Sequence, residues 1–90
     1  MMEKTIHSPE NAAFLAALKR TRKRAGLSQA DLAERLQETQ SWVSKCERGE
    51  RRLDLLEVRA VCRAIGVPFL QFAAEVDAEL HRLEQKASTQ

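Results

Sequence analysis

Polar and apolar positions along the chain follow the period of an α-helix in five successive segments. The first runs from Pro9 to near Gly26, with Ser8 as its cap. Its apolar side carries Ala13, Phe14, Ala17, Leu18 and Thr21. Aromatic and β-branched residues, which favour sheets, are scarce. We therefore expect an all-α protein of five helices.

The second and third predicted helices are short and nearly adjacent, at about 29–36 and 40–48. Ser28 and Asp31 form a capping box for the second helix, Thr39 caps the third, and Gly49 ends it. Helices this short are not stable alone, so they must pack on each other. A pair joined by a tight turn predicts a helix-turn-helix, which presents its second helix to the major groove of DNA.

The fourth predicted helix begins at a second capping box, Asp54 with Glu57, and ends at Gly66. A fifth follows Pro68, with a heptad-like seam of Phe69, Ala73, Val76, Leu80 and Leu83. Phe69 and Phe72 are expected to cover the domain core. Val76, Leu80 and Leu83 continue past that core, which favours contact with a second copy. The polar residues 85–90 are expected to fray.

These segments predict one domain over residues 1–90, with its core at about 9–74 and a dimerisation segment at about 75–84. No apolar run is long enough to span a membrane, and the amino terminus lacks a secretion signal, so we expect a cytoplasmic protein. Residues 1–53 carry eleven Lys and Arg against seven acids, whereas residues 54–90 carry four against six. A basic front half suits contact with a polyanion.

The sequence contains no pattern that predicts catalysis, a metal site or a cofactor. Cys46 and Cys62 are sixteen residues apart, without a further thiol or His at ligand spacing. We expect them to be buried, reduced and hydrophobic in character. There is also no Gly-rich phosphate loop and no nucleophile beside a base.

One face of the third predicted helix is polar and lies opposite Val43 and Cys46. It carries Gln40, Ser41, Ser44, Lys45 and Arg48. Gln suits adenine, Lys suits guanine and Ser suits either, so we predict that Gln40, Ser41, Ser44 and Lys45 read bases. The alternative is a solvated face of a surface helix.

Two basic clusters flank this helix and predict contacts with phosphates. One holds Lys19, Arg20, Arg22, Lys23 and Arg24, part of which also complements the dipole of the first helix. The other holds Arg51 and Arg52. Gln29 and the amide groups around it are placed to hold a further phosphate. Trp42 has two interpretations, core packing or an indole against the DNA backbone.

The predicted phosphate contacts are thus Gln29, Lys19, Arg20, Lys23, Trp42, Arg48, Arg51 and Arg52.

The stretch from Leu18 to Val67 resembles the Xre-type, lambda-repressor-like helix-turn-helix family. The resemblance rests on Gly-Leu-Ser-Gln at residues 26–29, Glu-Arg-Gly at 47–49 and Ala-Ile-Gly-Val at 64–67. It implies a five-helix domain in which Gln29 binds phosphate, the 40–45 face reads bases, and Arg22 pairs with Glu47 inside the fold. A buried Glu47 also needs a cation on physical grounds.

The turn departs from the family pattern. Gln37 and Glu38 stand where Gly and an apolar residue are usual, and a left-handed Gln37 costs about 1 kcal/mol relative to Gly. Glu38 also places a negative charge near the DNA side.

Two functions fit these observations. The first is a homodimeric, sequence-specific repressor that binds a palindromic double-stranded DNA operator. The second is an antitoxin-like component that binds an unidentified partner protein and regulates its own operon.

Overall fold

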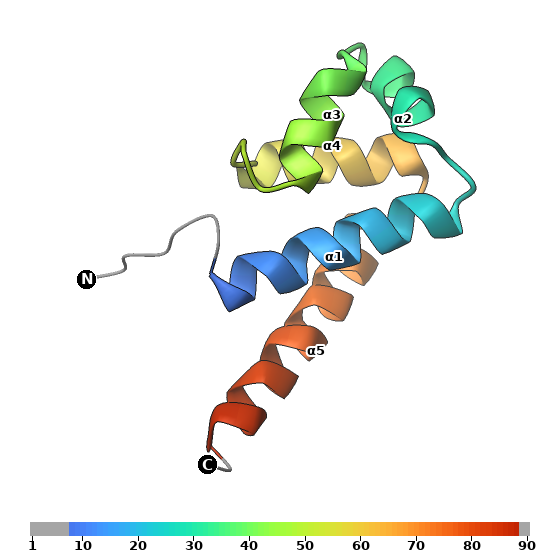
Figure 1. The fold of residues 1–90 in the computed structure, drawn as a ribbon. Coiled ribbons are helices and arrows are strands. Elements are labelled where there is room, and N and C mark those ends of the chain that lie inside the picture. Colours follow the sequence, from blue (N-terminus) through green and yellow to red (C-terminus); the bar gives the residue numbers. More distant parts are fainter. Residues whose placement is uncertain (1–7, 89–90) are drawn as a thin grey trace.

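The computed structural model describes residues 8–88, and residues 1–7 and 89–90 lie outside the described part. The described chain forms five helices, α1 (Pro9–Arg24), α2 (Gln29–Leu36), α3 (Gln40–Glu47), α4 (Leu55–Ile65) and α5 (Phe69–Ser88) (Figure 1). Residues 8–88 contain no strand, so the all-α prediction is confirmed. The expectation about a secretion signal concerns residues outside this range.

Local capping sets the helix starts where the sequence predicts them. Ser8 Oγ accepts a hydrogen bond from the Asn11 amide at 3.1 Å and so begins α1. At α4, Asp54 Oδ1 accepts from the Glu57 amide at 2.7 Å, and Glu57 Oε1 accepts from the Asp54 amide at 2.9 Å. These bonds satisfy amide groups that have no partner within the helix. The ends of α1, α3 and α4 agree with the prediction within two residues, and the largest difference among them is α1, which ends at Arg24.

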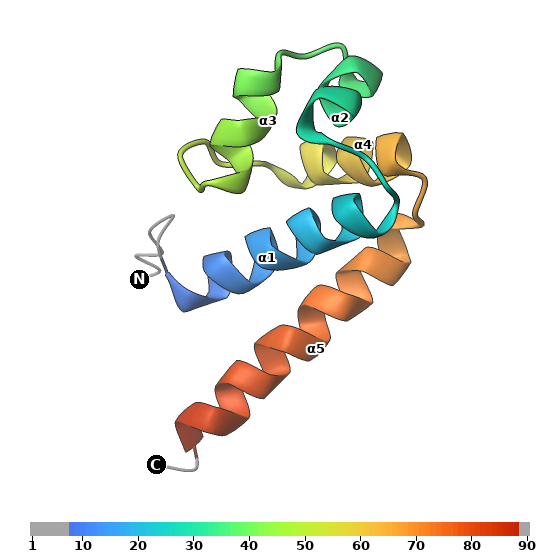
Figure 2. The ribbon, with the colours of Figure 1, turned by 45° about the vertical axis from the view of Figure 1, so that its right-hand side comes forward.

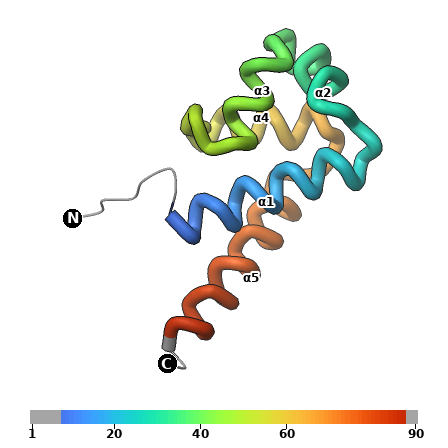
Figure 3. Tube along the Cα trace, in the orientation of Figure 1, coloured from blue at the N-terminus to red at the C-terminus, as the bar shows by residue number. Residues whose placement is uncertain are grey.

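The core lies where α1, α2, α3 and α4 meet the first turns of α5. The buried residues are Ala17, Leu18, Leu32, Ala33, Val43, Cys46, Val58, Val61, Cys62, Ile65 and Phe72. α1 lies between α3 and α5, and the tube in Figure 3 follows this arrangement along the chain. Figure 2 shows α2 and α3 at one end of the molecule and the C-terminal half of α5 at the other.

α5 covers the core further along its length than the sequence indicates. Phe72 is buried and its ring meets Phe14 edge to face, with centroids 6.2 Å apart. Val76 also packs against the core, two residues past the expected limit. The later seam residues, Leu80 and Leu83, are half-buried too, but they are not among the side chains that pack against the core.

The expectation of fraying from residue 85 is wrong for residues 85–88, which are helical. Gln, Lys and Ala are good helix formers, and Gln85 Nε2 lies 3.2 Å from His81 Nε2 one turn earlier. Polar character alone therefore does not end this helix. None of the helices in residues 8–88 has the length and apolarity that crossing a membrane requires.

Candidate nucleic-acid interface

α2 and α3 are joined by a three-residue turn whose backbone is held at every step. Gln37 adopts the left-handed conformation, with φ 58° and ψ 41°. Its amide donates to the Glu34 carbonyl at 3.1 Å, and the Glu38 amide donates to the Ala33 carbonyl at 2.9 Å. Thr39 Oγ1 then accepts from the Trp42 amide at 3.0 Å and starts α3. The turn is therefore well defined without the usual Gly.

A buried ion pair fixes α3 against α1. Arg22 Nε and Nη2 donate to the two carboxylate oxygens of Glu47 at 2.6 and 3.0 Å. The two side chains are only 6% and 5% exposed, so this is the pair that the resemblance implies. Arg22 Nη1 also donates to the Leu27 carbonyl at 2.8 Å, and Gln29 Nε2 donates to Glu47 Oε1 at 3.0 Å. The end of α1, the start of α2 and the last turn of α3 are thus joined by one network.

The network also sets the ionisation of Glu47. Burial by itself raises the pKa of the Glu47 carboxyl, but hydrogen bonds from Arg22 and Gln29 outweigh burial and hold the pKa below its ordinary value. Glu47 is therefore a carboxylate at neutral pH. Such a pair is costly to break, because each partner alone is a buried charge.

The opposite face of α3 points away from this network. Gln40, Ser41 and Lys45 are exposed, while Ser44 is half-buried. The side chain of Lys45 makes no hydrogen bond or ion pair within residues 8–88. Three of the four predicted base readers, Gln40, Ser41 and Lys45, thus share one accessible surface, and Ser44 is less accessible.

Arg48, at the end of the same face, is already engaged. Its Nε and Nη2 donate to Glu50 at 2.9 and 3.1 Å, and its Nη1 donates to Ser44 Oγ. The ion pair raises the pKa of Arg48 and lowers the pKa of Glu50. The predicted phosphate contact by Arg48 therefore competes with a carboxylate of its own chain.

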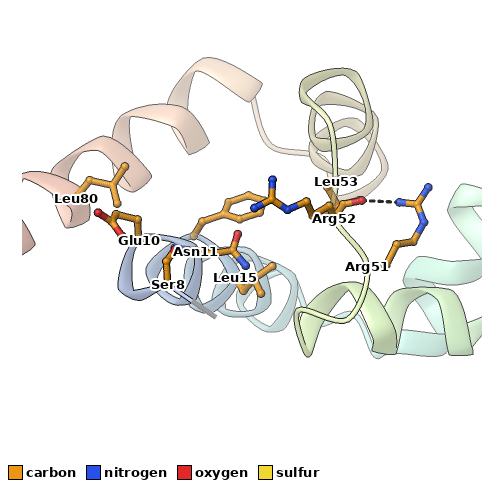
Figure 4. Close-up of a pocket in the computed structure, with 9 residues that line it drawn as sticks. Ser8, Glu10, Asn11, Leu15, Arg51, Arg52, Leu53 and Leu80 are labelled. Carbon is orange, nitrogen blue, oxygen red and sulfur yellow. Dashed lines mark hydrogen bonds between the residues drawn. The ribbon is translucent and has the colours of Figure 1, made fainter. Parts of the chain in front are cut away.

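Trp42 lies between the core and the side chain of Arg51. Trp42 is half-buried and packs against the core, and the Arg51 guanidinium lies 5.0 Å from its ring centroid. Arg51 also donates to Glu57 Oε2 at 2.8 Å and to the Arg52 carbonyl at 3.0 Å. Figure 4 shows Arg51 and Arg52 at one side of a cleft of about 430 Å³ that reaches Leu80.

The remaining predicted phosphate contacts lie on α1 and at the start of α2. Lys19, Arg20 and Lys23 are exposed on α1, where they form one basic surface together with Arg24. Lys19 lies close enough to Glu47 to help lower its pKa, which places it on the side of α1 nearest α3. Gln29 is half-buried, with its amide directed to Glu47.

Sequence reasoning missed two acids that shape this surface, Glu50 and Glu57. Glu57 was assigned only to the capping box of α4, yet its second oxygen pairs with Arg51. Glu50 follows Gly49, where no helical spacing relates it to Arg48. A usable signal existed only for Glu50, which stands among three arginines in the run Glu-Arg-Gly-Glu-Arg-Arg at residues 47–52.

Both thiols lie in the core. Cys46 and Cys62 form no disulfide and are buried, and burial raises the pKa of both, although Arg51 interacts with Cys46 and opposes this effect there. Among residues 8–88, no group of three or more His, Cys, Asp or Glu side chains is placed to hold a metal ion.

Comparison with known proteins identifies the fold and the family. Residues 13–78 match the family of helix-turn-helix domains. An XRE-family like protein from Pseudomonas syringae pv. tomato str. DC3000 is 40% identical, with a TM-score of 0.75, over 82% of this chain and 90% of that one. No curated protein matches the chain.

Two structures of the clp gene regulator ClgR from Corynebacterium glutamicum share the architecture. One is 25% identical with a TM-score of 0.70 over 81% of this chain and 95% of that one. The other, at 22% identity and a TM-score of 0.75 over 91% and 87%, matches in fold. Together with the match over residues 13–78, these likenesses show that the chain belongs to the Xre-type helix-turn-helix family.

Proposed function

We propose that this protein is a homodimeric transcriptional repressor that binds a specific double-stranded DNA sequence. The observation that carries the proposal is the locked position of α3. Arg22, Glu47 and Gln29 hold its inner side, while Gln40 and Lys45 stand exposed on its outer side. A rigid helix with outward donors and acceptors beside a tight turn is suited to the major groove.

The charge around α3 supports contact with the DNA backbone. Lys19 and Lys23 are exposed on α1, and their side chains make no hydrogen bond or ion pair within the described residues. Cations of this kind release counterions when they meet phosphates, and that release supplies much of the affinity of DNA-binding proteins. On this proposal α1 supports the backbone on one side of α3, and Arg51 and Arg52 support it on the other.

The second half of α5 supports the dimer. Phe14, Leu55, Val76 and Leu80 line an apolar groove of about 280 Å³ between α1, α4 and α5. Leu83 lies one helical turn beyond Leu80 and is also half-buried. A second copy that places its own seam on this surface covers the same residues on both chains, as twofold symmetry requires. Two linked domains then present two α3 helices to an operator, and a promoter covered in this way is repressed.

A second candidate is an antitoxin-like component, and the exposed leucines favour it. Leu56 on α4 and Leu70 on α5 are 74% and 82% exposed, and neither lines the groove. Apolar side chains outside the dimer seam suit a different partner protein. A toxin-like gene beside this one, and copurification of its product, favour the second candidate over the first.

Selection of bound duplexes from a random DNA pool tests the proposed function. We expect enrichment of one sequence with two inverted half-sites, about one or more helical turns apart. Enrichment of a single half-site would support sequence-specific DNA binding but contradict the dimer. A pool that remains random contradicts the proposal.

A further inference from the structure

Arg48 is held in one orientation on the accessible side of α3. Two of its nitrogens, Nε and Nη2, meet the Glu50 carboxylate at 2.9 and 3.1 Å, and Nη1 donates to Ser44 Oγ. Helical side chains lean toward the preceding turn, so the guanidinium lies over Ser44. The side chains of Arg48 and Glu50 are 53% and 52% exposed, which leaves the outer edge of the group open.

The backbone places Glu50 beside Arg48. Gly49 has a φ of 78°, a conformation that favours glycine. Its amide donates to the Cys46 carbonyl at 3.1 Å, and the Glu50 amide donates to the Lys45 carbonyl at 2.8 Å. These two bonds form a Schellman motif at the end of α3. Glu50 therefore starts from a fixed backbone, unlike a residue on a mobile loop.

The bonds within the chain leave a defined part of Arg48 available. A guanidinium has five N–H donors, and three of them point to Glu50 and Ser44. The two that remain are on the two terminal nitrogens, one on each. Guanine presents two acceptors in the major groove, N7 and O6, the same number as the donors that remain on Arg48.

The charge of the pair disfavours a phosphate contact at the same place. Glu50 offsets the positive charge of Arg48, and Lys45 is the next cation that acts on Glu50. A neutralised cation releases fewer counterions when it approaches a phosphate. The directional donors of Arg48 remain, whereas its attraction for the backbone is reduced.

We propose that Arg48 reads a guanine, and that Glu50 and Ser44 are positioning residues that orient its guanidinium. The inference rests on the proposed DNA-binding function. It reverses two roles from the sequence, since Arg48 moves from phosphate binding to base reading and Ser44 moves from base reading to support. The ligand is the acceptor edge of one G·C pair in the operator.

The test uses the duplex that the wild type selects, its set of single-base-pair substitutions, and a random duplex. Arg48→Ala should lose about tenfold to a hundredfold discrimination at one G·C pair. Arg48→Ala also leaves the Glu50 carboxylate uncompensated, so its affinity for random duplex should fall, but by a smaller factor than the discrimination lost at the G·C pair, and its salt slope should stay near that of the wild type. Glu50→Gln should lose part of the discrimination at that same pair and bind random duplex more tightly, because it removes a negative charge.

Glu38→Gln is the matched control, since it removes the same charge at the turn without touching Arg48. It should raise affinity for all duplexes and leave discrimination at the G·C pair intact. Helical content measured by circular dichroism checks that each variant is folded.

Uniform weakening by Arg48→Ala, with the salt slope reduced by about 1, would show a phosphate contact and overturn the inference. Identical behaviour of Glu50→Gln and Glu38→Gln would overturn the positioning role. If the wild type enriches no sequence, both the proposed function and this inference are contradicted. If the wild type enriches a sequence but Arg48→Ala keeps full discrimination at every base pair, only this inference is contradicted.

Discussion

The arginines of the candidate interface have different roles, because the fold places different partners beside them. Arg22 is buried against Glu47, Arg51 stacks on Trp42, and Arg48 is held by Glu50. The side chains of Lys23 and Lys45, by contrast, make no hydrogen bond or ion pair within residues 8–88. A count of cations therefore overstates the number that are available to phosphates.

Lys45→Ala and Gln40→Ala should each relax base preference. Both side chains are exposed on the outer face of α3, so each removal should cost about 1 to 3 kcal/mol at the base pair that it reads. Binding to substituted operators measures the loss for each base pair. An equal loss on operator and random duplex would show that these side chains contact only the backbone.

Lys23→Ala should weaken binding to every duplex to a similar extent. The side chain is exposed on the basic surface of α1, so its removal should lower the slope of log affinity against log salt by about 1. Arg59→Ala is the control, because it removes the same charge from an exposed position on α4. If both variants keep the wild-type slope, the α1 cations are solvated surface.

Glu47→Gln should destabilise the fold at neutral pH and much less in acid. Burial opposes ionisation of Glu47, but Arg22 and Gln29 hold its pKa below the ordinary glutamate value. The pair therefore stabilises the fold above the unfolded-state pKa, about 4.3, and this contribution is lost as pH falls through the lower folded-state pKa.

We expect the free energy of unfolding to fall by about 3 kcal/mol at pH 7 and the gap to wild type to narrow below pH 4. Chemical denaturation over this pH range measures both. Glu75→Gln, which breaks the exposed pair with Arg24 at 3.4 Å, should cost about 1 kcal/mol or less. If the difference in free energy of unfolding between wild type and Glu47→Gln is the same at all pH values, the loss of stability in acid does not come from Glu47.

At the scale of elements, the turn between α2 and α3 contains backbone strain that a substitution can relieve. Gln37 is the one non-glycine residue with positive φ in the described chain. Gln37→Gly should raise the free energy of unfolding by roughly 0.5 to 1 kcal/mol, since relief of strain exceeds the added entropy of the unfolded chain. Gln37→Ala keeps the Cβ atom and should not stabilise. Thermal unfolding compares the three proteins, and equal stabilisation by Ala would point to the side chain instead.

The elements that the sequence predicts best are those with local start and stop signals. Ser28 with Asp31, Asp54 with Glu57, and Gly66 each act within four residues, so their helices begin or end as predicted. The end of α5 lacks such a signal, and its helical continuation to Ser88 was missed.

The site was predictable to the same extent and for the same reason. The polar face of α3 follows from helical spacing and is exposed as expected. Which acids pair with Arg48 and Arg51 depends on the path that the backbone takes after Gly49. Helical spacing does not predict the path of a loop, so the sequence did not indicate that Glu50 and Glu57 pair with these arginines.

At the scale of the whole molecule, the C-terminal half of α5, which carries the proposed dimer seam, lies at the opposite end from α2 and α3 (Figure 2), although Leu80 shares a cleft with Arg51 and Arg52. Leu80→Asp should leave a folded monomer, because Leu80 is half-buried at the groove and not in the core. Operator binding should weaken strongly, since each half-site then binds without the linkage that raises effective concentration. Sedimentation at tens of micromolar measures the assembly.

Leu70→Asp is the control for that experiment, since Leu70 is 82% exposed and does not line the groove. It should remain dimeric. A monomeric wild type, or a Leu80→Asp variant that stays dimeric, would assign the groove to the chain's own core or to another partner.

The short connection between α4 and α5 has a consequence for the operator. Only Gly66, Val67 and Pro68 separate the two helices, and Arg24 on α1 pairs with Glu75 on α5. With two copies joined through α5, no long linker within residues 8–88 lets one reading helix turn relative to the other. Adding one base pair between half-sites rotates them by about 34° around the DNA axis. We therefore expect the proposed dimer to bind two correct half-sites tightly only at one spacing between them.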